Sequence, residues 1–220
     1  MKLLVSAVGL FIVIAAAGMF FLTDNTTDAK AVIDPLPEIV RYKIDPKKST
    51  FIVHAYRGGL AYFKGHDHLI AVRDFSGEAT LTLDVLNPAS LQMNISAASL
   101  EETSDVFTRQ QKSIINKELE EIVLETAKYP EITFKSSEVN GVLKNGKFEL
   151  KIGGDITLHG VTRHIVIPAT VSVEGELLRA IGEFELDRTK FNVKATSAFH
   201  GLVRVKNKLK FTFNITAQRN

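Results

Sequence analysis

Residues 75–85 have the sequence FSGEATLTLDV, in which apolar or small residues alternate with polar ones. In an extended chain, one face would carry Phe75, Gly77, Ala79, Leu81, Leu83 and Val85. Such an alternation of period two is typical of a strand with one face in the core and the other in water. The segment therefore predicts a half-buried antiparallel strand.

The same alternation recurs along the chain from Tyr42 onward, separated by turn sequences such as Asn87-Pro88 and Asn145-Gly146. It is clearest in residues 91–97, 147–158, 165–173, 178–186 and 209–217, with shorter strands around Val53 and Phe134. About eight strands with one apolar face must form a sandwich or a barrel, and closure leaves no exposed edges. The pattern predicts an all-β protein with an antiparallel eight-stranded barrel.

Residues 104–127 interrupt the alternation with a helical pattern. Phe107, Ile114, Ile115, Leu119, Ile122 and Val123 recur at roughly helical spacing among charged residues. The sequence predicts one amphipathic helix or a broken pair, with Thr103 or Ser104 as the N-cap. A helical insertion between strands should lie across an end or edge of the barrel.

Composition excludes several functional classes. The 220-residue chain has no cysteine, which rules out thiol catalysis, cysteine-ligated zinc and disulfides. Its formal net charge of +2 is not that of a nucleic-acid-binding protein, which usually has a basic stripe. No Gly-x-Ser-x-Gly elbow, phosphate-binding glycine loop or His-Glu-x-x-His helix is present. We therefore expect a binding protein rather than an enzyme.

The N-terminus predicts export. Residues 1–22 are apolar after Lys2 and are read as a signal peptide or a signal anchor. Ala15-Ala16-Ala17 offers a cleavage site, and an uncleaved segment would hold the protein at a membrane. Residues 23–40, with Pro35 and Pro37, are predicted to be a linker. The expected location is the periplasm or the outer face of the cytoplasmic membrane.

An eight-stranded barrel is either filled by its own side chains or holds one small ligand. Seven small residues fall on the predicted inward faces: Gly77, Ala79, Ala97, Gly154, Ala169, Ala180 and Gly182. They would leave unfilled volume, although the glycines could instead mark bends in the strands. No carboxylate or lysine falls consistently on these faces, so a ligand in the lumen should be an apolar chain.

Four ordered segments resemble landmarks of the YceI family: YKIDP (42–46) followed by Ser49, DFSG (74–77), KYPEITFKS (128–136) and GDITLHGVT (154–162). The resemblance covers about residues 41 to 218 and assigns residues 41–220 to one YceI-like domain. It implies a lipocalin-like barrel and a bound polyisoprenoid lipid or isoprenoid quinone that the protein sequesters or carries. Strand parity then selects the expected lipid contacts: Phe51, Val53, Leu81, Leu83, Met93, Ile95, Phe134, Ile156, Leu158, Phe184, Phe211 and Phe213.

Two polar clusters are candidates for other contacts. Arg109 and Lys112 could bind a pyrophosphate or quinone head group, or could simply lie on an exposed helix face. His66 and His68, two apart on an extended chain, could bind a metal with His54 or His200 as a third ligand. The sequence thus leaves two alternatives to a lipid carrier: an envelope metal- or haem-binding protein, and a structural or stress-related module without a ligand. It also leaves the oligomeric state open, a dimer included.

Overall fold

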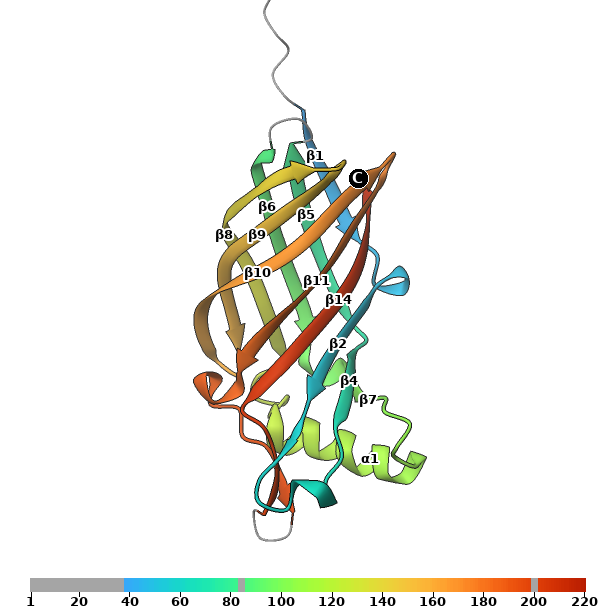
Figure 1. Ribbon diagram of the computed structural model, residues 1–220, viewed down its shortest axis with the longest axis vertical. Coiled ribbons are helices and arrows are strands. Elements are labelled where there is room, and N and C mark those ends of the chain that lie inside the picture. Colours follow the sequence, from blue (N-terminus) through green and yellow to red (C-terminus); the bar gives the residue numbers. More distant parts are fainter. Residues whose placement is uncertain (1–37, 83–85, 199–201) are drawn as a thin grey trace, which may run out of the picture. The chain divides into compact units, whose positions relative to one another are not determined.

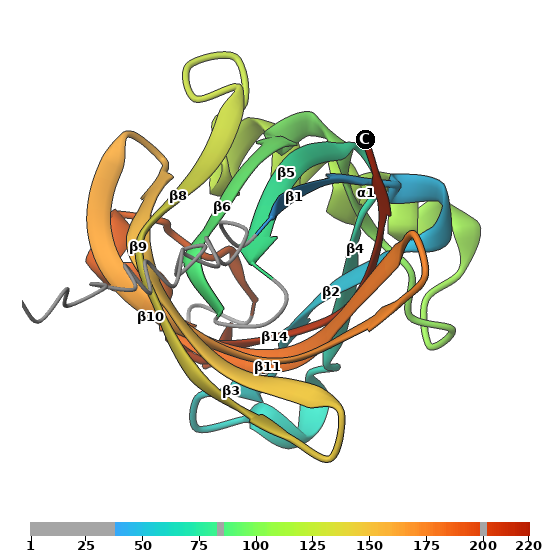
Figure 2. The ribbon, with the colours of Figure 1, turned by 90° about the horizontal axis from the view of Figure 1, so that it is seen from above.

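Eight antiparallel strands form a closed barrel (Figures 1 and 2). The last strand, β14, returns to pair with the first, with Tyr42 opposite Arg219. Around the ring, the strands are β1 (Ile39–Ile44), β5 (Phe75–Thr82), β6 (Leu86–Ser96), β8 (Glu131–Lys144), β9 (Lys147–Leu158), β10 (Val161–Glu174), β11 (Leu177–Asp187) and β14 (Lys208–Arg219). The expected antiparallel eight-stranded barrel is confirmed.

The computed structural model describes residues 38–82, 86–198 and 202–220, which belong to a compact unit spanning residues 36–220. The predicted export segment 1–22 and nearly all of the predicted linker 23–40 lie outside the described residues. Within the described ranges, no helix is long and apolar enough to cross a membrane.

Three of the barrel strands bend and continue beyond the ring as a second strand. β1 passes through η1 (Pro46–Lys48) into β2 (Thr50–Ala55), β4 (His68–Val72) leads into β5, and β6 passes through η3 (Ala97–Ser99) into β7 (Leu100–Glu102). The Ser49 hydroxyl bridges the first bend, because it donates to the Asp45 carbonyl and accepts from the Thr216 N–H. Beyond the bends the sheet runs β14–β2–β4–β7, and β7 has no strand on its far side among the described residues.

A helical insertion occupies that side of the barrel end, between β7 and β8 (Figure 1). Helix α1 (Arg109–Glu118) continues as a π-helical turn, η4 (Leu119–Val123). The insertion is confirmed, but the expected N-cap is wrong. The cap is Thr108, whose side chain accepts from the Gln111 N–H while the Gln111 side chain accepts from the Thr108 N–H. Ser104 donates its N–H to Glu102 and Thr103 donates its hydroxyl to the Leu69 carbonyl, so both residues fasten the preceding loop.

A small three-stranded sheet lies at the same end of the barrel (Figure 1). It is formed by β3 (Arg57–Gly58), β12 (Ser197–Ala198) and β13 (Val203–Val205). Two short 3-10 helices flank it: η2 (Tyr62–Lys64) and η5 (Arg188–Phe191). This end of the barrel therefore has more irregular structure than the opposite end, where short turns join β8 to β9 and β10 to β11. We call that opposite end the hairpin end.

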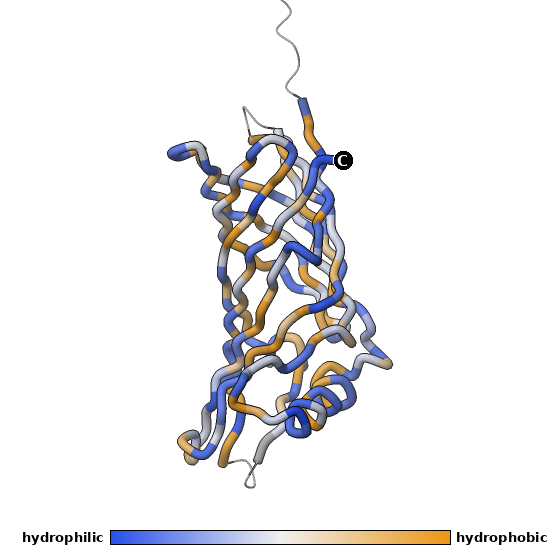
Figure 3. The backbone as a smooth tube through the Cα atoms, turned by 90° about the vertical axis from the view of Figure 1, so that its right-hand side faces the viewer, coloured by the Kyte–Doolittle hydropathy of each residue, from blue (hydrophilic) through white to orange (hydrophobic). Residues whose placement is uncertain are grey.

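Apolar and polar residues alternate along the barrel strands (Figure 3), and the apolar set faces inward. On β9, for example, Phe148, Leu150 and Ile152 are buried while Glu149 and Lys151 are exposed. β8 changes its parity at a register shift between Ser136 and Glu138, which brings Val139 into the core. The dry faces therefore enclose one continuous interior.

Candidate binding cavity

The barrel interior is hollow and contains two chambers. The upper chamber lies toward the hairpin end of the barrel and the lower chamber lies beside α1. The free volume open to a water-sized sphere is about 120 Å³ in the upper chamber and about 180 Å³ in the lower one. A single water needs only roughly 10–15 Å³ by this measure. Each chamber is therefore far larger than an ordinary packing defect.

Alanines, and not glycines, create the space in the upper chamber. Ala79, Ala89, Ala169, Ala180 and Ala217 line it, and the polar residue types on its wall are Thr80, Ser90 and Thr133. The inward glycines are covered by neighbouring side chains instead. A Cβ on Gly154 would lie 2.8 Å from the Phe134 ring and 2.4 Å from the Lys135 carbonyl, and one on Gly182 would lie 2.5 Å from the Phe213 ring. The expectation that small inward residues leave free volume holds for Ala79, Ala169 and Ala180, which line the chamber. Ala97 is buried without lining either chamber, and glycine permits close packing at positions 77, 154 and 182.

A constriction separates the two chambers. The same side chains line the floor of one and the roof of the other: Phe51, Ile95, Ile132, Ile156 and Phe184. The aromatic rings among them continue into a cluster, because Phe184 stacks on Phe211 at 4.9 Å and Phe51 meets Phe75 edge-on at 6.3 Å. These five side chains therefore form the boundary between the two chambers.

The lower chamber is enclosed partly by strands and partly by the helical insertion. Ile115 of α1, together with Leu119, Val123 and Leu124, faces Val53 and Leu158 of the barrel. Four side chains with polar groups also reach its wall: His68, Glu118, Arg188 and Thr196. The lumen wall is thus mostly apolar, and its charged and histidine side chains lie at the end that contains α1.

Arg188 fastens the wall of the lower chamber. Its guanidinium donates to the carbonyls of Val193 (2.9 Å), Val205 (3.4 Å) and Lys206 (3.4 Å), and to the side-chain oxygen of Asn207 (2.9 Å). Burial lowers the pKa of Arg188 from its usual very high value, but a guanidinium stays charged at neutral pH. The side chain therefore ties the chain around Val193 to β13.

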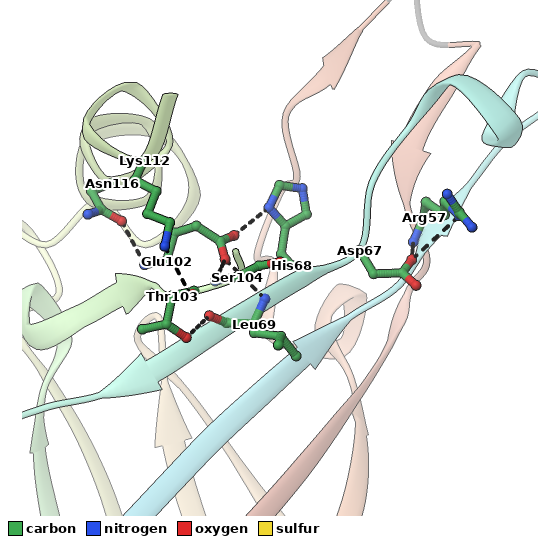
Figure 4. Close-up of polar contacts among 9 residues, drawn as sticks. All are labelled: Arg57, Asp67, His68, Leu69, Glu102, Thr103, Ser104, Lys112 and Asn116. Carbon is green, nitrogen blue, oxygen red and sulfur yellow. Dashed lines mark hydrogen bonds and ion pairs between the residues drawn. The ribbon is translucent and has the colours of Figure 1, made fainter. Parts of the chain in front are cut away.

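A buried carboxylate ties the insertion to the barrel (Figure 4). The Glu102 side chain is 0% exposed, and it accepts hydrogen bonds from His68 Nδ1 (2.7 Å) and from the backbone N–H groups of Ser104 (2.8 Å) and Leu69 (3.2 Å). Burial acts to raise the pKa of Glu102, but these hydrogen bonds outweigh it and lower the pKa below its ordinary value. The Glu102 N–H in turn donates to Asn116 of α1 at 2.8 Å.

The structure places ten of the twelve predicted lipid contacts on the chamber walls. Phe51, Ile95, Ile156 and Phe184 line both chambers; Met93, Phe134 and Phe213 line the upper one; and Val53, Leu158 and Phe211 line the lower one. Leu81 is 3% exposed and packs in the core without lining either chamber, and Leu83 lies outside the described residues. Contact of any of these twelve residues with a lipid stays a prediction.

The predicted head-group residues are not on the chamber walls. Arg109 is exposed at the start of α1, and Lys112 donates to the Thr103 carbonyl at 3.1 Å. The lower chamber instead presents Arg188, Glu118 and Thr196, which the sequence analysis missed. Arg188 continues the inward parity of β11 two residues beyond Leu186, and that spacing was the available signal.

The structure brings both predicted histidines to one aromatic ring, that of Phe107. His66 precedes β4 and is exposed, whereas His68 is the first residue of β4. His66 meets Phe107 edge-on, and His68 stacks on the same ring. His54 pairs with Thr212 on the outer face, since its neighbour Ala55 faces the lumen, and His200 lies outside the described residues. No group of three or more metal-binding side chains occurs among the residues that the structure describes.

A closed eight-stranded barrel with a hollow apolar lumen is the architecture of β-barrels that hold a small ligand. The YceI-like domain model matches residues 42–217, and the chain belongs to that family.

Relatives and solved structures agree with this assignment. "Protein YceI" of Escherichia coli O6:H1 is 32% identical over 136 residues, which are 61% of this chain and 63% of that protein. A "UPF0312 protein" of Pseudomonas savastanoi is 35% identical over 107 residues, 47% of this chain and 49% of the relative. The matches thus span from about half to under two thirds of these relatives.

Two solved structures share the fold at low sequence identity. BcnA of Burkholderia cenocepacia has a TM-score of 0.63 at 21% identity, with 80% of this chain and 99% of BcnA covered. A polyisoprenoid binding domain from Saccharophagus degradans, implicated in plant cell wall breakdown, has a TM-score of 0.59 at 12% identity, with 82% and 99% covered.

Proposed function

We propose that this protein is an exported lipid-binding protein that sequesters or carries one long isoprenoid lipid or quinone in its barrel. The observation that carries the proposal is the pair of apolar chambers that meet at Phe51 and Phe184. Transfer of apolar ligand surface from water into this lumen would contribute roughly 25 cal/mol per Å². The solved polyisoprenoid binding domain with the same fold supports an isoprenoid as the ligand class.

The polar end of the lumen suggests an orientation for the ligand. An isoprenoid tail would occupy the upper chamber and the constriction, and a head group would lie near His68, Arg188 and Thr196. Helix α1 would cover that end through Ile115 and Leu119. The apolar segment 1–22 supports delivery to the periplasm or to the outer face of the cytoplasmic membrane.

The test is extraction and mass spectrometry of lipid that co-purifies with the full chain. We expect an isoprenoid at about one molecule per chain in the wild type, and much less in Ala180→Phe, which fills the upper chamber. The matched control is Ile181→Phe, because the next residue of β11 is 55% exposed on the outer face and should retain the lipid.

The stability of Ala180→Phe separates a cavity from a packed core. Overpacking a filled core costs about 1–3 kcal/mol, whereas a ring placed in free volume should cost little. A wild type that neither carries nor takes up isoprenoid lipid, combined with strong destabilisation by Ala180→Phe, would contradict a carrier and favour a ligand-free structural module.

A further inference from the structure

Four large apolar side chains are exposed around the small three-stranded sheet, at the barrel end that contains α1. Leu60 is 84% exposed, Phe63 67%, Tyr62 55% and Leu202 45%. The first three lie between β3 and β4, and Leu202 immediately precedes β13, in the small sheet at the lower end of Figure 1. We call these four residues the apolar tip. Exposed apolar groups that gather in one place mark interaction sites more often than isolated ones do.

The backbone holds the apolar tip in a fixed arrangement. The Ala61 N–H donates to the Leu202 carbonyl at 2.9 Å, which joins the two segments. Gly59 has a φ of +92°, and a Cβ there would lie 2.4 Å from the same carbonyl oxygen. The Tyr62 and Phe63 rings meet edge-on at 6.1 Å. The four side chains are therefore displayed by a hydrogen-bonded scaffold.

Basic residues surround the apolar tip. Arg57, Lys64, Arg204 and Lys206 lie on the same two segments, and the one acidic residue there, Asp67, is 3.8 Å from Arg57 Nε. Figure 4 shows that pair beside β4. Within the described part of the chain, Arg204 and Lys206 form no ion pair and are exposed. An apolar cluster with a basic surround complements an anionic surface that has an apolar layer beneath it.

The apolar tip is continuous with the wall of the lower chamber. Val205 of β13 lines that chamber, and the alternation of the strand places its neighbours Arg204 and Lys206 on the opposite side. A surface that binds here would lie next to the end of the lumen where the polar groups gather.

We infer that the apolar tip docks on the surface of an anionic lipid bilayer. Leu60, Tyr62 and Phe63 would enter the interfacial layer, where aromatic rings are favoured, and Arg204 and Lys206 would contact lipid phosphates. Docking itself does not depend on the cargo. Only its use in transferring a lipid between the bilayer and the lower chamber rests on the proposed function.

The opposite end of the barrel provides the control surface. Val142 and Leu143 are 60% and 61% exposed on the β8–β9 hairpin, so this end also exposes apolar side chains. No aromatic side chain of this hairpin is exposed, and Lys144 is within 3.8 Å of Glu149, which offsets its charge. The hairpin still has Lys147 exposed, so it differs from the tip in having no exposed aromatic side chain and a smaller excess of basic residues.

Because the chain has no cysteine, a single Phe63→Cys or Leu143→Cys change gives one labelling site for an environment-sensitive fluorophore. The labelled full chain is added to phosphatidylcholine vesicles with or without phosphatidylglycerol, with bromine atoms on the acyl chains as a quencher. Residues 1–22, where they are not cleaved, would attach the chain to any vesicle, so local quenching is the measurement and total binding is not. Thermal unfolding and lipid content are measured on the same samples.

We expect strong quenching at position 63 on anionic vesicles, weaker quenching without phosphatidylglycerol or at high salt, and little at position 143. Arg204→Gln with Lys206→Gln should lower the ratio of docked to undocked tip roughly thirtyfold, at about 1 kcal/mol for each basic residue near the surface. Absent quenching at 63, equal quenching at both positions, or no dependence on anionic lipid would each overturn the inference. An empty barrel that still docks would contradict the carrier function alone.

Discussion

The contacts of single residues explain how the insertion stays attached to the barrel. Glu102 is buried, and its carboxylate joins His68 of β4 to the loop that precedes α1 (Figure 4). Hydrogen bonds to a charged group contribute about 1.5–3 kcal/mol, and a buried partner left unsatisfied adds to the cost. The stability of the lower chamber should therefore depend on the charge of this one residue.

We predict that Glu102→Gln lowers the free energy of unfolding by about 1.5–3 kcal/mol at neutral pH. The folded state lowers the pKa of Glu102 below its ordinary 4.5, so the carboxylate stabilises the fold above that pH. Its contribution is lost as the pH falls through the folded-state pKa. The difference between wild type and variant in urea unfolding should therefore shrink in acid.

The matched control for this prediction is Glu101→Gln. Glu101 is the preceding residue of β7, its side chain is 50% exposed, and its ion pair with Arg73 is in solvent. Exposed pairs contribute at most about 1 kcal/mol. A Glu102→Gln effect that matched the control, or that did not change with pH, would refute the role assigned to the buried carboxylate.

At the residue scale, strand parity predicted most of the chamber wall but could not predict which gaps are filled. Parity placed Gly154 and Gly182 inward beside Ala169 and Ala180, and it left open whether the glycines leave space or mark bends. The rings of Phe134 and Phe213 come from neighbouring strands and cover the glycines, whereas the alanines remain uncovered. That distinction depends on register between strands, which a single sequence does not specify.

At the scale of elements, α1 covers the lower chamber. Its hydrogen bonds to the barrel side are those of Asn116 and Lys112 with residues 102 and 103. Its first turn depends on the capping box between Thr108 and Gln111, and its lumen face presents Ile115. The pairing of β6 with β8 ends at Ser96 and Glu131. Beyond that point, α1 has no strand beside it that could cover the lower chamber in its place within the described residues. Local opening of α1 should therefore need less free energy than opening of the barrel strands.

We predict that Thr108→Ala speeds amide hydrogen exchange in residues 109–118 roughly fivefold, because loss of an N-cap costs about 1 kcal/mol. Peptides from β9 and β14 should exchange as in the wild type. Ser113→Ala is the control, since Ser113 is exposed within the same helix and alanine has the higher helix propensity. Equal acceleration in the strands would mean that α1 does not open independently.

The elements themselves were predictable where the pattern is periodic. The alternation in residues 147–158 and 209–217 predicted β9 and β14, because only an extended chain keeps those apolar residues on one face. The register shift at Ser136 was not predictable, since Lys135-Ser136-Ser137-Glu138 has no alternation to follow. The cap of α1 was readable from Thr108 and Gln111, whose spacing is that of a capping box, and it was missed because Thr103 and Ser104 are equally good acceptors.

At the scale of the whole molecule, the bends in three strands make a barrel with two different ends. The hairpin end closes on short turns such as Asn145-Gly146, whereas the other end carries α1, the small sheet and the polar groups of the lower chamber. A ligand that lies along the lumen would contact both halves of the bent strands, from Met93 near one end to Phe211 near the other. Its binding should thus stabilise the fold as a unit.

We therefore predict that a long isoprenoid alcohol raises the unfolding temperature of the lipid-free chain. Free ligand at a hundred times its Kd contributes about 2.7 kcal/mol, which corresponds to roughly 5–11 °C for a domain of this size. Scanning calorimetry with ligand supplied from cyclodextrin measures the shift, and a short isoprenoid alcohol, too small to span the constriction, is the control. Ala180→Phe should reduce the shift that the long ligand causes. Ile181→Phe should leave that shift unchanged. Equal shifts from both alcohols would mean that one chamber suffices, and that the constriction at Phe51 and Phe184 is a wall between two sites rather than a passage.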